Sequence, residues 1–238
     1  MEKSWSFHIG PIYFDGTVLV MTVLSCAIIF AFVYWASRKM TLRPTGKQNA
    51  LEWVIDFVNG VTKSNMGASD SRRYSLFFFV LFMFIFVANN IGLMSKIEGS
   101  NELSYWKSPT ADIAVTLTLS LIVALVANLS GVKRFGFKGY LKHAFLKPMP
   151  AMLPMNIIDQ FVNFMSLALR LYGNIFAGEV MIGLICQLGN VKPVLLPIAI
   201  IVEMAWTAFS LFIGSLQAYV FVLLSSMYIN EKIEIEED

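Results

Sequence analysis

The chain has 238 residues, of which 57% are hydrophobic and only 14% charged, and its mean hydropathy is +0.66. Soluble domains carry roughly 25% charged residues, so this composition excludes a soluble globular domain and indicates an integral membrane protein. The formal net charge of +2, the two histidines and the two cysteines give no support for a nucleic-acid-binding protein or for a haem, zinc or iron–sulfur centre. We expect neither a metal nor a cofactor.

Five apolar segments are long enough to cross a bilayer, which takes about 20 residues. They cover about 17–37, 74–95, 111–132, 151–188 and 194–230. The N-terminus does not show a positively charged region leading into a short apolar run with a small-residue cleavage site, so we expect the first segment to be a retained helix. Cys26 and Cys186 both lie in apolar runs, and we expect both to be buried. The predicted fold class is an all-α integral membrane protein with a single domain over 1–238.

The segment 47–66, between the first two spans, has apolar residues at helical spacing with polar residues between them. The apolar positions are Leu51, Val54, Ile55, Val58 and Val61, and the polar ones are Glu52, Asp56, Asn59 and Lys63. We expect an amphipathic helix that lies on the membrane surface. The alternative, a core helix of a soluble insert, is disfavoured because the segment is too short to fold alone.

The second and third spans contain a few polar residues near one end. Asn89 and Asn90 either line a path for polar species or pack against and cap neighbouring helices, which is the more common role. Thr110 and Asp112 are typical of a helix start, although Asp112 is also a candidate to border a water-filled vestibule.

The last two apolar segments are longer than a bilayer requires. About 38 residues of helix extend over roughly 57 Å, against roughly 30 Å of hydrocarbon. Residues 190–193 predict a turn between them. The chain should therefore end in a long helical hairpin that is tilted or bent, as expected for packing against a curved partner.

The first arm of this hairpin contains Arg170 within an almost uncharged apolar stretch. An arginine inside the membrane costs about 2.5–3.5 kcal/mol and keeps its proton, so it needs an acidic partner or a watery path. Four polar residues share its helical face, namely Asn156, Gln160, Asn163 and Asn174. Glu179 follows nine residues later, so it faces the opposite way, about 13.5 Å further along the axis.

The second arm carries a polar stripe at spacings of three and four residues, formed by Glu203, Thr207, Ser210, Gly214 and Gln217. Counted from the turn, Glu179 and Glu203 lie at similar depth, and Gln217 lies deeper, near the level of Arg170. Such stripes either hold helices together or mark an ion path. A carboxylate on the outer side can exchange protons, whereas the deeper arginine cannot lose its proton. This combination favours a proton relay.

Basic residues gather in the connections on one side of the five spans, and this side is expected to be cytoplasmic. These connections contain Arg38, Lys39, Arg43, Lys47, Lys63, Arg72, Arg73, Lys133, Arg134, Lys138, Lys142 and Lys147, whereas the opposite side has Lys3, Lys96, Lys107 and Lys192. We therefore expect the N-terminus outside and the C-terminus in the cytoplasm.

The stretch 167–179, LALRLYGNIFAGE, resembles nearly letter for letter the signature of subunit a of the bacterial rotary ATP synthase membrane sector. The stretch PTADIAVTLTL from Pro109 is similar to the family's third-span pattern, in which Asn is often found at the place of Ala114. SLQAYVF from Ser215 is similar to its last-helix motif.

The resemblance implies a non-catalytic subunit of the bacterial cell membrane that packs against a ring of c subunits and assembles with the subunit b stalk. Two offset aqueous half-channels would carry protons to and from carboxylates of the ring. Arg170 would face the ring between them, Asn174 and Gln217 would position it, and Glu179 would relay protons in the outer half-channel. Further candidates to line the half-channels are Asn163, Asn89, Asn90 and Asp112.

One position departs from the family pattern. Some relatives have a histidine at the place of Ser210, and serine cannot titrate there. We expect Glu203, seven residues earlier on the same face, to substitute for it.

Two other functions compete with this interpretation. A self-contained secondary transporter or channel for an anionic solute is disfavoured because no internal repeat or pair of interrupted helices is seen. A structural scaffold does not account for Arg170. The sequence has no nucleotide-binding motif, and it shows no sodium cage, which favours H⁺ over Na⁺.

Overall fold

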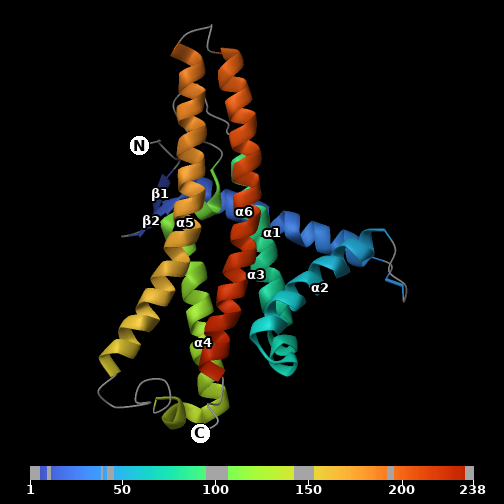
Figure 1. Cartoon of the computed structure of the whole chain (residues 1–238), viewed down its shortest axis with the longest axis vertical. Helices are drawn as coiled ribbons and strands as arrows, with labels where there is room; N and C mark the ends of the chain where they lie inside the picture. Colours follow the sequence, from blue (N-terminus) through green and yellow to red (C-terminus); the bar gives the residue numbers. More distant parts are fainter. Residues whose placement is uncertain are drawn as a thin grey trace.

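The computed structural model describes residues 6–9, 12–38, 40–41, 46–94, 107–141, 153–191 and 196–233. Its helices are α1 (Gly16–Ser37), α2 (Lys47–Asn65), α3 (Ala68–Met94), the 3₁₀ turn η1 (Pro109–Ala111), α4 (Ile113–Leu141), α5 (Leu153–Val191) and α6 (Leu196–Ile233) (Figure 1). All of the α-helices except α2 are long and apolar enough to cross a membrane. The predicted all-α membrane class with five spans is confirmed.

A short β-hairpin before α1 was not predicted. Strands β1 (Ser6–Ile9) and β2 (Ile12–Asp15) pair antiparallel, with Ser6 opposite Asp15. Asp15 then begins α1, because its Oδ1 accepts a hydrogen bond of 3.0 Å from the Thr17 backbone N–H. The expectation that Cys26 is buried is wrong, since it is exposed on α1. Only one face of this helix packs against the protein, and Cys26 lies on the other.

The predicted amphipathic helix is present as α2. Leu51 and Val58 are buried against α3 and α6, whereas Trp53 on another face is 67% exposed. Near its start, the Lys47 ammonium lies 4.7 Å from the ring centre of Trp35 in α1. The periodicity of the apolar residues therefore predicted the helix and its buried side, and its location on the membrane surface stays a prediction.

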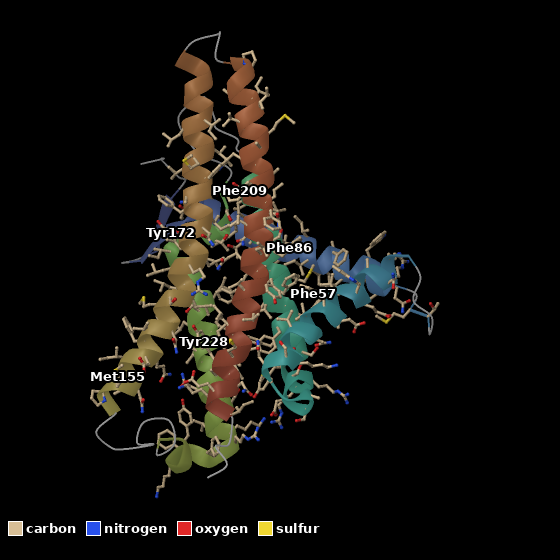
Figure 2. The ribbon with its side chains drawn as sticks, in the orientation of Figure 1. Phe57, Phe86, Met155, Tyr172, Phe209 and Tyr228 are labelled. Atoms are coloured by element: carbon tan, nitrogen blue, oxygen red, sulfur yellow. The ribbon has the colours of Figure 1, made fainter. Side chains whose placement is uncertain are left out.

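The helices α5 and α6 form the long hairpin that the sequence predicts (Figure 1). They have 39 and 38 residues, which corresponds to about 58 and 57 Å. Figure 2 shows Met155 of α5 and Tyr228 of α6 toward the same end of this hairpin, as antiparallel arms require. The helix α5 continues through Val191 and α6 begins at Leu196, so the predicted turn at 190–193 overlaps the end of α5.

The main hydrophobic core joins α3, α4, α5 and α6. Its fully buried side chains include Phe78, Ile85, Leu171 and Phe221. The core keeps one face of α5 against the protein, so the opposite face, which carries Arg170, remains on the outside of the chain.

Two helices extend beyond the predicted spans. The helix α3 begins at Ala68, before the predicted start at residue 74, and has Asp70 in its first turn. A helix can extend beyond the apolar segment that crosses the hydrocarbon. The helix α4 continues past residue 132 until Gly136, whose φ of 72° interrupts it. Asp70 and Arg134 pair across these extensions at 3.1 Å.

Several predicted features lie outside the described residues. They are Lys3, Lys39, Arg43, Lys96, Lys142, Lys147, Lys192, the side chain of Cys186 and the acidic residues at the C-terminus. The orientation of the chain in the membrane stays a prediction.

Candidate functional site

Arg170 lies midway along α5 and its side chain is exposed. Its Nη2 donates a long hydrogen bond of 3.5 Å to Ser166 Oγ, one turn earlier on the same helix. Among the described residues, no carboxylate forms an ion pair with it. A permanently charged group in an apolar helix is therefore left facing outward, where a second molecule can approach it.

Asn174 and Gln217 meet one turn beyond Arg170. The Asn174 Nδ2 donates a hydrogen bond of 2.8 Å to Gln217 Oε1, which joins α5 to α6. Gln217 is only 4% exposed, and within the part of the chain that the structure describes its Nε2 has no hydrogen-bond partner. A buried N–H₂ donor without an acceptor is costly, so this group is suited to bind a water molecule or an incoming polar group.

Glu179 contacts a different part of the molecule. Its Oε1 accepts a hydrogen bond of 2.8 Å from the backbone N–H of Ser108, just before η1. Ser108 is joined in turn to Asn89 of α3 through Thr110, and the Asn89 Nδ2 donates to the Gly214 carbonyl of α6 at 3.0 Å. These polar contacts connect α3, η1, α5 and α6 in a buried region.

Glu203 and Ser210 lie on α6 near the level of Glu179. The two arms are aligned here by the Trp206 indole N–H, which donates to the Gly178 carbonyl at 3.3 Å. Glu179 and Glu203 both lie beyond this bond on the side of the turn, Glu203 half-buried, which agrees with their expected similar depth. Ser210 is buried between this bond and the Asn174–Gln217 bond.

Asn163 lines a pocket on the other side of Arg170, between α4, α5 and α6. The pocket has a volume of about 40 Å³, and its largely apolar lining includes the polar side chains of Ser120, Asn128, Gln160 and Tyr228. The Gln160 Nε2 donates to Asn128 Oδ1 at 2.7 Å, and the Tyr140 hydroxyl donates to the same oxygen. Because it has both room and polar partners, this pocket can hold water.

The chain is similar to one protein family along most of its length. A family model described as ATP synthase A chain matches residues 19–230. The protein named ATP synthase subunit a from Enterococcus hirae is 54% identical over 237 residues, covering 99% of each chain. The chain belongs to the ATP synthase subunit a family. Proteins of the same name from Enterococcus faecalis and Streptococcus gordonii are 50% and 51% identical over 239 residues, covering 99% and 100% of each chain.

Family membership confirms the resemblance drawn from residues 167–179. It identifies a multi-pass membrane protein that is a component of an ATP synthase. Within the family signature, Arg170 and Asn174 lie on the exposed face of α5, whereas Glu179 contacts the residue before η1. One continuous sequence motif therefore contributes to two separate parts of the structure.

Two of the candidate lining residues make local contacts next to these places. The Asp112 Oδ1 accepts a hydrogen bond of 2.7 Å from the Ala114 backbone N–H, so Asp112 caps α4. Asn90 is half-buried and its Nδ2 donates to the Phe86 carbonyl of its own helix at 2.6 Å. Of the two roles considered for Asp112 and Asn90, the structure therefore shows a helix cap for Asp112 and a contact within its own helix for Asn90.

The sequence reasoning missed Ser108 and Asn128. Ser108 precedes a helix start and gave no sign that its backbone N–H would meet a side chain 71 residues away. Asn128 was visible as a polar residue inside the apolar segment 111–132, and its spacing of eight residues from Ser120 would have marked a polar face toward α5.

Proposed function

We propose that this chain is the proton-conducting stator subunit of the ATP synthase membrane sector. It would provide two aqueous half-channels to a ring of c subunits and couple proton flow to rotation of the ring. The observation that carries the proposal is the position of Arg170, exposed at the middle of an apolar helix and unpaired with any described carboxylate of its own chain. A carboxylate on a second subunit is the partner that such a group requires.

Arg170 would attract the ionised form of each ring carboxylate as it passes. Because arginine cannot give up its proton, it stabilises the carboxylate without joining the proton path, and its charge repels a proton that would cross directly. Asn174 and Gln217 would form the polar surroundings of Arg170. The Gln217 Nε2, which has no hydrogen-bond partner among the described residues, supports a contact with the passing ring carboxylate.

The two half-channels would lie on either side of Arg170. On the predicted outer side, Glu179 would exchange protons with the ring, and Glu203 would take the place of the histidine that some relatives have at the position of Ser210. Asn89 belongs to the polar region next to Glu179. On the predicted cytoplasmic side, the pocket lined by Asn163 supports a watery region, since it ends at the last turn of α6.

The proposal includes the surroundings of the subunit. The chain would have no catalytic site of its own and would assemble with the c-subunit ring and the subunit b stalk in the bacterial cell membrane. Its N-terminus would lie outside and its C-terminus in the cytoplasm, as the distribution of basic residues predicts. We propose H⁺ as the transported ion.

ATP-driven acidification of inverted membrane vesicles tests this function. We expect Arg170→Ala to abolish acidification while the complex, quantified by native gel, stays assembled. Ser166→Ala removes the hydroxyl that Arg170 contacts within its own helix and is the matched control, which should pump normally.

Normal pumping by Arg170→Ala would overturn the proposal, and equal losses in both variants would reduce Arg170 to a packing residue. Purification of the chain without c subunits would favour the alternative, a self-contained transporter for an anionic solute.

A further inference from the structure

The residues that hold Glu179 form a defined structure around η1. We propose that Asn89 and Thr110 are positioning residues that fix the Ser108 backbone N–H on the Glu179 carboxylate and so orient the carboxylate for proton exchange. This inference rests on the proposed function, in which Glu179 relays protons, and it assigns a cause to the orientation of that side chain.

Ser108 is held at both its backbone and its side chain. Its N–H donates to Glu179 Oε1 at 2.8 Å, and its hydroxyl shares one proton between the Ala88 carbonyl of α3 at 2.9 Å and Thr110 Oγ1 at 2.7 Å. The residue is completely buried. Its N–H therefore has a fixed direction, unlike a water molecule or a rotating hydroxyl.

Thr110 and Asn89 connect Ser108 to the helix bundle. The Thr110 hydroxyl lies 2.7 Å from Ser108 Oγ and donates to Asn89 Oδ1 at 2.6 Å. Asn89 in turn donates to the Gly214 carbonyl. Asn89 and Thr110 are completely buried, so removal of either polar group leaves another without its partner.

Gly92 is the second, independent observation for the close contact. A Cβ atom at this position would lie 2.2 Å from Ser108 Cβ and 2.7 Å from the Ser108 nitrogen, the atom that donates to Glu179. Only a residue without a side chain allows η1 to approach α3 this closely. The absence of a side chain at Gly92 and the polar contacts of Ser108 thus both determine the position of the Ser108 nitrogen.

The chemical consequence concerns the direction of the carboxylate. A carboxylate has two oxygens, and when one is held by a fixed N–H the other has fewer directions available to it. Proton transfer depends on the distance and angle between donor and acceptor. A loosened Glu179 would spend less time in the geometry that transfers protons, although it could still titrate.

Vesicle acidification in the assembled complex tests this inference through a double-mutant cycle. Thr110→Val keeps the shape of the side chain but removes the hydroxyl, and we expect pumping to fall roughly tenfold, the scale of one lost buried hydrogen bond. Thr110→Ser restores the hydroxyl and should restore pumping. Thr118→Val is the control, because the exposed Thr118 hydroxyl bonds only the Ala114 carbonyl of its own helix at 2.7 Å.

The cycle also includes Glu179→Gln, which cannot exchange protons. If Thr110 acts through Glu179, Thr110→Val should cause no further loss in the Glu179→Gln background. Losses that multiply would overturn the inference and leave Thr110 with a structural role only. Normal pumping by Glu179→Gln alone would instead contradict the proposed relay, so the two failures are distinguishable.

Discussion

Arg170 and Glu179 are nine residues apart on the same helix, yet their surroundings differ in kind. Glu179 accepts a hydrogen bond from a buried backbone N–H, and the donor residue is itself tied to α3. Arg170 is exposed, and its hydrogen bond to the serine one turn away on its own helix is long, at 3.5 Å. The chain thus holds Glu179 with hydrogen bonds from its own residues, whereas it leaves the Arg170 side chain exposed to another molecule.

The difference indicates where another subunit completes the site. A half-buried, hydrogen-bonded carboxylate is ordered before any partner arrives, whereas an exposed arginine in an apolar helix is stabilised only when an acidic group meets it. Substitutions at Arg170 should therefore affect coupling without affecting the fold, and substitutions around Glu179 should affect both.

The largest effect is expected from Arg170→Lys. Lysine keeps a positive charge but can lose its proton when desolvated, and it lacks the planar pair of donors that binds a carboxylate. We expect ATP-driven acidification to fall about 100-fold, the scale of losing one well-placed electrostatic contact. The level of assembled complex should not change. Pumping equal to wild type would mean that any positive charge suffices at this position.

A smaller loss is expected from Glu179→Gln. Glutamine still accepts the Ser108 N–H but cannot exchange protons, so the fold should be retained. We expect acidification to fall roughly tenfold, less than the 10²–10⁴ of a fully lost acid–base group, because Glu203 remains nearby. Adding Glu203→Gln should lower it further. If the double variant pumps no worse than Glu179→Gln, Glu203 does not substitute for the missing histidine.

Gly92→Ala tests the ordered side of the comparison. The new methyl group would lie 2.2 Å from Ser108 Cβ, so η1 or α3 must shift. We expect the stability of the subunit to fall by about 1–3 kcal/mol, as for overpacked cores. The thermal inactivation of the assembled complex measures this. Gly60→Ala is the control, since a Cβ there meets nothing within 4 Å, and its stability should be equal or slightly higher because alanine favours a helix more than glycine.

The smallest effect is expected from Asp70→Asn. Arg134 is the internal contrast to Arg170, because it pairs with a carboxylate of its own chain at 3.1 Å, but both side chains are partly exposed. Such pairs contribute about 0–1 kcal/mol, so thermal inactivation and pumping should hardly change. A large loss of pumping would show that an unpaired arginine anywhere in the chain disturbs coupling, and the contrast with Arg170 would lose its meaning.

The sequence predicted most of the fold because apolar length and periodicity are local properties. The five spans, the amphipathic helix α2 and the long hairpin all follow from them, and so does the level of Gln217 near Arg170. The β-hairpin before α1 and the interruption at Gly136 were missed, since short strands carry a weak signal and one glycine inside an apolar run does not reveal its φ angle.

The site was predictable only where it lies on one helix. Helical spacing placed Arg170 and Asn174 on one face and Glu179 on the other. It could not predict that Ser108 would meet Glu179, because that contact depends on how closely η1 approaches α3 at Gly92. Long-range contacts of this kind are decided by packing, which the linear pattern does not contain.

The central claim is that the exposed face of α5 around Arg170 meets another subunit. Cross-linking tests it most directly: Ala177→Cys places a thiol on this exposed face, in a background without the two native cysteines, and a benzophenone probe attached to it is photoactivated in the assembled complex. We predict a cross-link to a c subunit that depends on light. Cross-links only to lipid or to other parts of the same chain would contradict the account.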